Sequence, residues 1–292
     1  GGGVDDYKFG AVMQEEVSDT GVIGSANGMT LHNDIVLPYY LSLANDDQKA
    51  RWLPKMVTGE YITAIAITEP NAGSDMAGTK TTAVKKGDTY VVNGSKTFIT
   101  NGINSDLVLT VCRTDPEAGH RGFSLIVLER GMKGFERGRN LDKLGMHAQD
   151  TAELFFEDVR VPVGNLIGPE NAGFMLIMAN FQAERLALAV MAYMTAQMAL
   201  EACLDHVRDR VTFGKPLAKH QVIRHKLAEM ATQVDVAREY AYRVAARMQA
   251  GKPAVQEVSM AKNFATEVAD KTMVLSIALA LTVPACTPCS AA

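Results

Sequence analysis

The amino-acid sequence predicts an α+β protein: a helical N-terminal part, a middle antiparallel β-domain and a C-terminal antiparallel helical bundle. The first 60 or so residues carry apolar side chains at helical spacing. Residues 62–162 read as short apolar, β-branched runs between turn residues, and the helical period returns from residue 171. The 292-residue chain is 47% hydrophobic and 21% charged, which is typical of a globular protein and excludes intrinsic disorder.

The N-terminal segment contains one helix with signals at both of its ends. Asn45 or Asp46 is a suitable N-cap, because a short polar side chain can accept a hydrogen bond from the first turn. Pro54 is expected to stop the same helix.

The middle segment is expected to form strands near residues 63–68, 107–111, 123–128 and 152–156. Residues 85–88 and the pair Asn93-Gly94 have the composition of hairpin turns. Strands separated by turns at this spacing favour a sandwich or barrel over a parallel sheet.

The last segment is predicted to hold helices over residues 172–208 and 221–250 and a third after Pro253. Short connections between long amphipathic helices favour an antiparallel bundle. The amphipathic rhythm is expected to end after Met273. The expected divisions are a helical domain over 1–61, a β-domain over 62–165, an incomplete bundle over 166–274 and an unrelated tail over 275–292.

Charge and composition exclude several classes of function. A net charge of −4 gives no electrostatic footprint for nucleic acid. The four cysteines are too few and too scattered for a disulfide framework, which favours a reducing compartment. No apolar run is expected to span a membrane, and no histidine or cysteine spacing indicates a metal site.

Glu184 is the candidate catalytic residue. It lies three residues after Phe181 and four before Leu188, within an apolar stripe of a long helix. Burial of an unpaired carboxylate costs free energy. Desolvation also raises the pKa of the carboxyl group towards the value that a general base needs near neutral pH. The alternative is a structural ion pair with a cation, for example Arg185.

Two loops are candidate ligand-binding segments. Residues 68–75 follow a strand and combine glycine with hydroxyl side chains, which could approach a phosphate or a heterocycle or could form an ordinary turn. Residues 210–215 are basic and aromatic, which suits either a phosphate or a helix terminus.

Four segments in this order resemble the acyl-CoA dehydrogenase family, over almost the whole span from Val4 to Met273. They are residues 67–75 (ITEPNAGSD), 93–101 (NGSKTFITN), 145–151 (GMHAQDT) and 210–215 (RVTFGK). The resemblance is closest to the long-chain type, and the chain looks truncated at both ends against the family. It implies the three-domain plan above, with FAD bound between the last two domains.

The resemblance also implies roles for individual residues. Glu184, in the context Glu184-Arg185-Leu186, matches the base of the long-chain and isovaleryl types. Ser74 and Arg185 would lie near the substrate. The residues implied to contact FAD are Ile65, Ile67, Thr68, Gly73, Ser74, Phe98, Ile99 and Thr100, with Arg210, Thr212, Phe213 and Gln221 reaching the FAD of a neighbouring subunit.

The function implied by the resemblance is FAD-dependent α,β-dehydrogenation of acyl-CoA thioesters to trans-2-enoyl-CoA in fatty acid β-oxidation. Electron-transferring flavoprotein would be the acceptor and a homotetramer the assembly, in a bacterial cytoplasm or a mitochondrial matrix. The alternatives are a branched-chain, isovaleryl-type dehydrogenase, an oxidase that passes the electrons to oxygen, and an inactive truncated fragment.

Overall fold

The computed structural model describes residues 6–280, which fall into two compact units. The first unit contains Val22–Glu184, and the second contains the described residues 6–21 together with 185–280. The division falls inside one long helix, α5 (Gly173–Asp209). The three-domain division expected from sequence stays a prediction, because the units group residues by their contacts.

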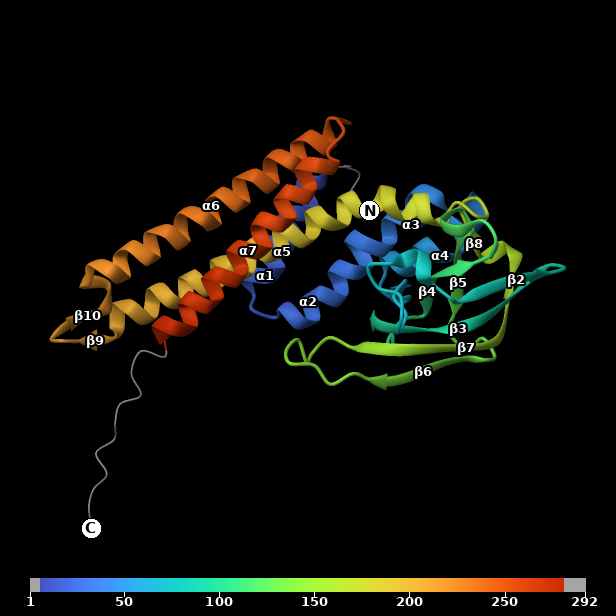
Figure 1. Cartoon of the computed structure of the whole chain (residues 1–292), viewed down its shortest axis with the longest axis horizontal. Helices are drawn as coiled ribbons and strands as arrows, with labels where there is room; N and C mark the ends of the chain where they lie inside the picture. Colours follow the sequence, from blue (N-terminus) through green and yellow to red (C-terminus); the bar gives the residue numbers. More distant parts are fainter. Residues whose placement is uncertain (1–5, 281–292) are drawn as a thin grey trace, which may run out of the picture. The chain divides into compact units, whose positions relative to one another are not determined.

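The first unit is built on an eight-stranded sheet (Figure 1). The strand order is β6-β7-β3-β2-β4-β5-β8, and β1 pairs with β4. Most pairs are antiparallel, as predicted, but β1–β4 and β2–β4 are parallel. The strands are β1 (Thr63–Ala66), β2 (Thr82–Lys86), β3 (Thr89–Thr100), β4 (Leu107–Arg113), β5 (Phe123–Glu129), β6 (Phe135–Asn140), β7 (Thr151–Pro162) and β8 (Leu166–Ile167).

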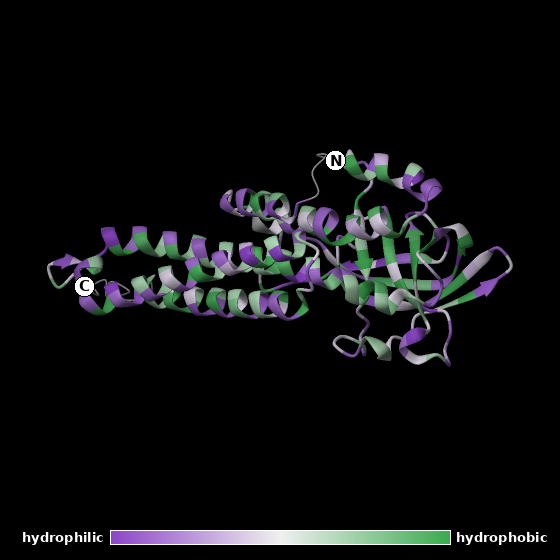
Figure 2. Cartoon of the chain, turned by 90° about the horizontal axis from the view of Figure 1, so that it is seen from above, coloured by the Kyte–Doolittle hydropathy of each residue, from purple (hydrophilic) through white to green (hydrophobic). Residues whose placement is uncertain are grey.

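Strands β4 and β5 of this sheet are buried on both faces. On β4, Leu107 and Leu109 belong to one core cluster, whereas Val108 and Cys112 belong to another. Alternate side chains of a strand point to opposite faces, so the sheet separates two cores. Figure 2 accordingly shows mostly hydrophobic strands, with hydrophilic residues at the tip of the β2–β3 hairpin.

Helices cover one face of the sheet in this unit. They are α2 (Ile23–Thr30), the π-helix η1 (Leu31–Val36), α3 (Leu37–Leu43) and α4 (Asp46–Val57), with short 3₁₀ turns at Met76–Gly78, Gly119–Arg121 and Val163–Asn165. Tyr39, Tyr40 and Trp52 pack into the core cluster of Leu107 and Leu109. The side chain of Asn45 caps α4 in a capping box with Gln48, which confirms the predicted helix start.

The predicted stop at Pro54 is wrong, because α4 continues through it to Val57. A proline in the last turn removes a single helical donor, and the Pro54 carbonyl still accepts the N–H of Thr58 at 3.3 Å. The following turn is retained because Trp52 and Met56, four residues apart, are both buried.

The predicted turn at Asn93-Gly94 is also wrong, because both residues lie inside β3. Asn93 exchanges two hydrogen bonds with Asp158, the positive-φ residue of a bulge in β7. Gly94 lies so close to Thr81 that an added Cβ would be 2.5 Å from the Thr81 Oγ1. The glycine therefore permits close strand contact. The other predicted turn is confirmed, since Gly87-Asp88 joins β2 to β3.

The second unit is a bundle of helices. It contains α1 (Tyr7–Asp19), the later part of α5, α6 (Gln221–Gln249) and α7 (Val255–Ala280), with a short hairpin of β9 (Val211–Thr212) and β10 (Lys215–Pro216) and a 3₁₀ turn at Leu217–Lys219. Helices α5, α6 and α7 run side by side in Figure 1 and share one core cluster. The Glu15 carboxylate of α1 accepts hydrogen bonds from Tyr193 at 2.6 Å and from Tyr242 at 2.8 Å.

Helix α7 continues past the point where the helical rhythm was expected to end. The helix continues beyond Met273 as far as Ala280. In this last part, Leu279 is buried and the Ser276 hydroxyl donates a hydrogen bond to the Ala199 carbonyl at 3.1 Å. Alanine and leucine are strong helix formers, so the loss of amphipathic spacing did not end the helix. The rest of the predicted tail, residues 281–292, lies outside the described residues.

Two features of helix α5 bear on the expectations. By length and composition alone it is apolar enough to cross a membrane, but half of its most apolar window is buried, as in the core helix of a bundle. Beyond Glu184, the predicted stripe residues Leu188, Met191 and Met198 are half-buried. The buried residues of the helix in this part are Leu186, Ala189, Val190, Ala192, Tyr193, Met194, Ala196, Leu200, Cys203 and Val207.

A buried ion pair fixes the loop after β1. The Lys96 ammonium, with no exposed side-chain surface, lies 2.9 Å from the Glu69 Oε1 and also donates to the Ile67 carbonyl. The Glu69 carboxylate accepts the backbone N–H groups of Lys80 at 2.7 Å and Thr81 at 2.9 Å. Burial alone would raise the pKa of this carboxyl, but the charge of Lys96 and these hydrogen bonds hold that pKa below its ordinary value.

We expect Lys96→Met to lower the free energy of unfolding of this unit by about 3–5 kcal/mol, because it leaves the Glu69 carboxylate buried without its cation. Urea denaturation followed by the fluorescence of Trp52, the one tryptophan, measures the change. Lys80→Met is the matched control, since the Lys80 side chain is exposed and only its backbone contacts Glu69. An equal loss in both variants would contradict the prediction.

His32 joins the π-helix η1 to two neighbouring segments. Its Nδ1 accepts the backbone N–H of Thr63 at 3.1 Å, so the ring proton belongs on Nε2, which lies 3.1 Å from the Met56 carbonyl. Burial lowers the pKa of His32 from 6.5 and outweighs the opposite effect of the Met56 hydrogen bond. A second proton, on Nδ1, would face the backbone N–H of Thr63, so this contact also disfavours the charged ring.

Because the folded state lowers the pKa of His32, the unfolded chain binds the proton more tightly. The contribution of neutral His32 to the free energy of unfolding is therefore fully present above pH 6.5 and is lost as the pH falls below that value. We expect the urea midpoint to fall as the pH drops below 6.5, and to fall less in His32→Gln. His147→Gln replaces an exposed imidazole and should keep the wild-type profile. Identical profiles for the two variants would refute the assignment.

Candidate functional site

The loop of residues 68–75 is held tightly at its base. The backbone N–H groups of Glu69 and Ala72 bond reciprocally to each other's carbonyls, and the N–H of Thr97 on β3 donates to the Thr68 carbonyl at 2.9 Å. Gly73 and Ser74 are exposed beyond this base, and a Cβ added at Gly73 would meet no atom within 4 Å. The loop therefore presents backbone and a hydroxyl on an open surface.

Phe98 is the unusual residue of this surface. It lies where the register of β3 against β7 shifts between Lys96 and Ile99, and its φ of 58° is in the left-handed region. Its side chain is 69% exposed, whereas Ile99 is buried. A bulky residue with positive φ is strained, and such strain is concentrated at functional sites. The bulge turns an aromatic ring outward beside the 68–75 loop.

Thr100, at the end of β3, is oriented by a residue that sequence reasoning missed. Its Oγ1 accepts a hydrogen bond from the Gln149 Nε2 at 2.9 Å, and the Gln149 Oε1 in turn accepts from the Asn27 Nδ2 at 2.7 Å. A hydroxyl that accepts from an amide directs its own proton elsewhere. The signal for Gln149 was its place in the 145–151 motif, which carried no individual role.

Strand β1, the 68–75 loop and the end of β3 carry the predicted flavin residues of the first unit. Ile65 lies on β1, and Ile67 and Thr68 follow it, all three half-buried. With Gly73, Ser74, Phe98, Ile99 and Thr100 they combine an exposed aromatic ring with several hydroxyl groups. This donor set suits a flat heterocycle with a polar edge, so the residues present fit the flavin part of FAD.

Glu184 lies on α5 and is half-buried. Its Oε1 accepts the Tyr39 hydroxyl at 3.0 Å and the Asn180 Nδ2 at 3.0 Å. Sequence reasoning missed both donors. The spacing of four residues between Asn180 and Glu184 was the available signal, because such residues are neighbours on a helix face. Arg185, the predicted substrate residue beside it, is half-buried and belongs to the second unit.

The four remaining predicted residues lie together at the end of the second unit. Phe213 and Gly214 join β9 to β10 with φ values of 51° and 75°, as a two-residue hairpin turn of the primed type requires. The turn leaves the Phe213 side chain 96% exposed. Thr212 is half-buried beside His220, Arg210 is half-buried, and Gln221 is exposed at the start of α6. A guanidinium and an exposed aromatic ring in one short segment suit the phosphates and adenine of a dinucleotide.

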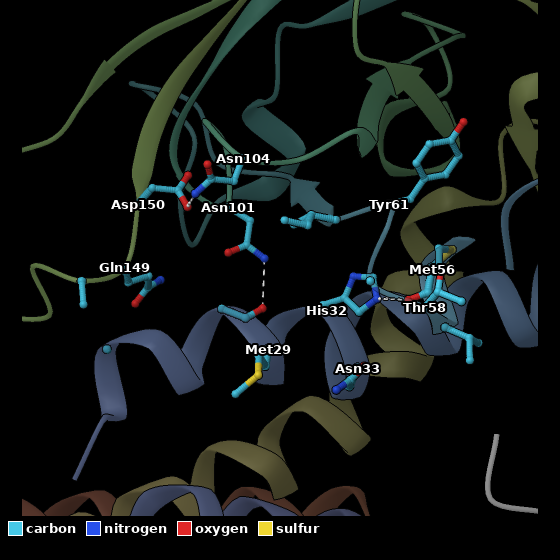
Figure 3. Close-up of a pocket in the computed structure, with 16 residues that line it drawn as sticks. Met29, His32, Asn33, Met56, Thr58, Tyr61, Asn101, Asn104, Gln149 and Asp150 are labelled. Carbon is cyan, nitrogen blue, oxygen red and sulfur yellow. Dashed lines mark hydrogen bonds between the residues drawn. The ribbon is translucent and has the colours of Figure 1, made fainter. Parts of the chain in front are cut away.

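A cavity of about 530 Å³ lies in the first unit. Gln149, which orients Thr100, is among its lining residues, but none of the predicted site residues is. Figure 3 shows His32, Asn101 and Asn104 around it with their hydrogen bonds to Met56, Gly28 and Asp150, respectively. These polar side chains are therefore already engaged by the protein. Among residues 6–280, no group of three or more His, Cys, Asp or Glu side chains is arranged to hold a metal ion.

Comparison with known proteins supplies the family. Residues 1–60, 64–159 and 171–280 match the family models for the N-terminal, middle and C-terminal domains of acyl-CoA dehydrogenase. The mitochondrial long-chain specific acyl-CoA dehydrogenase of Sus scrofa is 42% identical over 90% of this chain and 61% of its own length. The mitochondrial isovaleryl-CoA dehydrogenase of Pongo abelii is 37% identical over 84% of this chain and 58% of its own length.

A solved structure agrees with these relatives. The crystal structure of acyl-CoA dehydrogenase from Geobacillus kaustophilus matches with a TM-score of 0.92 and 49% identity, over 96% of this chain and 73% of that one. The chain spans about three fifths of the length of the two curated relatives. Three consecutive domain matches and a shared fold lead to one conclusion: the chain belongs to the acyl-CoA dehydrogenase family.

Proposed function

We propose that this chain carries out the α,β-dehydrogenation of acyl-CoA thioesters, with Glu184 as the base. The observation that carries the proposal is the Glu184 carboxylate, half-buried on a long helix and engaged by two hydrogen-bond donors. Its Glu-Arg-Leu context matches the base position of the long-chain and isovaleryl types. A carboxylate on a rigid helix is well suited to remove a proton from a fixed direction.

In the proposed reaction, the Glu184 carboxylate takes up the proton from the α-carbon, whose acidity the thioester carbonyl increases. FAD, when bound, supplies the acceptor for the hydride that leaves the β-carbon as the trans double bond forms. Phe98, Thr100 and the 68–75 loop would hold the flavin. Arg210, Thr212, Phe213 and Gln221 would reach the FAD of a neighbouring subunit, which requires an oligomer.

The proposed substrate class is a long-chain acyl-CoA, supported by 42–46% identity to long-chain relatives, against 41% to a short-chain relative and 37% to an isovaleryl relative. Ser74, exposed on its loop, and Arg185 would approach the substrate. The proposed acceptor is an electron-transferring flavoprotein, and the proposed location is a bacterial cytoplasm, or a mitochondrial matrix in a eukaryote. The proposed assembly is a homotetramer.

We expect Glu184→Gln to slow acyl-CoA-dependent flavin reduction at least about 100-fold, because the amide cannot accept the α-proton. The flavin absorbance of the FAD-loaded chain should be retained. Anaerobic stopped-flow absorbance after addition of a long-chain acyl-CoA measures the rate.

The matched control is Glu201→Gln, which changes an exposed glutamate of the same helix. Its rate of flavin reduction should equal that of the wild type. If Glu184→Gln reduces the flavin as fast as Glu201→Gln, Glu184 is not the base.

A further inference from the structure

The Glu184 carboxylate is the centre of a small hydrogen-bond network within the first unit. Two donors from different segments meet at its Oε1: the hydroxyl of Tyr39 on α3 and the amide of Asn180, one turn earlier on α5, each at 3.0 Å. We propose that Tyr39 and Asn180 are positioning residues, which hold this carboxylate in one orientation and keep it ionised for proton abstraction. The catalytic part of this inference rests on the proposed function.

In the hydrogen bond between Tyr39 and Glu184, the Tyr39 hydroxyl is the donor and the carboxylate is the acceptor. Tyr39 is almost fully buried, and burial together with the nearby charge of Glu184 raises the pKa of its phenol above the ordinary value. The phenol therefore stays protonated and donates to the carboxylate. Donation to a charged acceptor is stronger than donation to a neutral one, so the bond stabilises the ionised form of Glu184 over the protonated form.

The orientation of Asn180 is fixed by its two acceptors. Its Nδ2 donates to the Glu184 Oε1 and also to the Ile35 carbonyl at 3.2 Å. Both of these acceptors require a donor, so the amide cannot be reversed without losing both bonds. Ile35 belongs to the π-helix η1, a type of irregular helix that is frequent at functional sites. The carboxylate is thus tied to η1 and α3 as well as to its own helix.

Of the two donors in this network, Tyr39 is the titratable group that hydrogen-bonds to Glu184. On η1, His32 is turned to Thr63 and Met56, and burial raises the pKa of Asp34 to about 6. On α5 the adjacent charge is Arg185, the next residue in sequence. A change confined to the Tyr39 hydroxyl should therefore be seen in the titration of Glu184.

The chain offers a closely matched control for this change. Tyr40 follows Tyr39 on α3 and is equally buried, yet its hydroxyl has no hydrogen-bond partner among the described residues. Tyr39→Phe and Tyr40→Phe each remove one buried hydroxyl from the same helix. Only the first removes a donor from Glu184.

The test is a pH titration of the FAD-free chain of residues 1–292 carrying ¹³C in its glutamate carboxyl groups. The Glu184 resonance is assigned by its absence in Glu184→Gln and is followed by NMR from about pH 3 to about pH 9. We expect Tyr39→Phe to raise the Glu184 midpoint by about one pH unit, a roughly tenfold gain in proton affinity. Tyr40→Phe should leave the midpoint unchanged.

A second variant keeps the test independent of the folding of Tyr39→Phe. Asn180→Ser shortens the amide that reaches the same Oε1 and should also raise the midpoint. Equal midpoints for the wild type, Tyr39→Phe and Asn180→Ser would overturn the proposal. So would an equal shift in Tyr40→Phe, since that would be a general effect of losing a buried hydroxyl.

A separate measurement, the pH profile of flavin reduction, tests the proposed function. In the FAD-loaded chain, the acid limb of the pH profile for flavin reduction should move upward in Tyr39→Phe by the same amount as the NMR midpoint. A shifted midpoint with an unshifted profile would retain the network but reject Glu184 as the base. An unshifted midpoint rejects the positioning role whatever the enzyme does.

Discussion

The candidate flavin surface depends on the buried ion pair between Lys96 and Glu69. An ammonium with no exposed surface must be paired, and here its partner carboxylate also accepts the backbone N–H groups of Lys80 and Thr81. The pair therefore fixes both ends of the loop that presents Gly73 and Ser74 and ties that loop to β3. The bulge that turns Phe98 outward begins at Lys96 itself, so the ring and the loop are placed by one interaction.

The proposed base, Glu184, is held in place by hydrogen bonds between side chains. Glu184 lies within a long helix and accepts hydrogen bonds from side chains of α3 and α5, and the Ile35 carbonyl of η1 holds the second of these donors, Asn180. A reactive group supported by rigid elements and by a surrounding layer of hydrogen bonds keeps its geometry at little entropic cost. The strained position among the predicted flavin residues, Phe98, lies instead on a strand, where a flat heterocycle would need an open edge.

The order of helices and strands could be predicted because each segment has a clear hydrophobic period, and the capping box at Asn45 is a local signal. Local signals failed where distant contacts decided the structure. Asn93-Gly94 has the composition of a turn but meets a bulge at Asp158 and close contact with Thr81, while Pro54 lies in a helix held by Trp52 and Met56. Tyr39 could not be linked to Glu184 from sequence, because 145 residues separate the two.

The most direct test of the central claim is the visible absorption spectrum of the purified chain after reconstitution with FAD, followed by anaerobic addition of a long-chain acyl-CoA. The account predicts a bound-flavin spectrum that bleaches as the thioester is oxidised. A chain that retains no flavin after reconstitution, or that retains flavin which the acyl-CoA does not bleach, would contradict it.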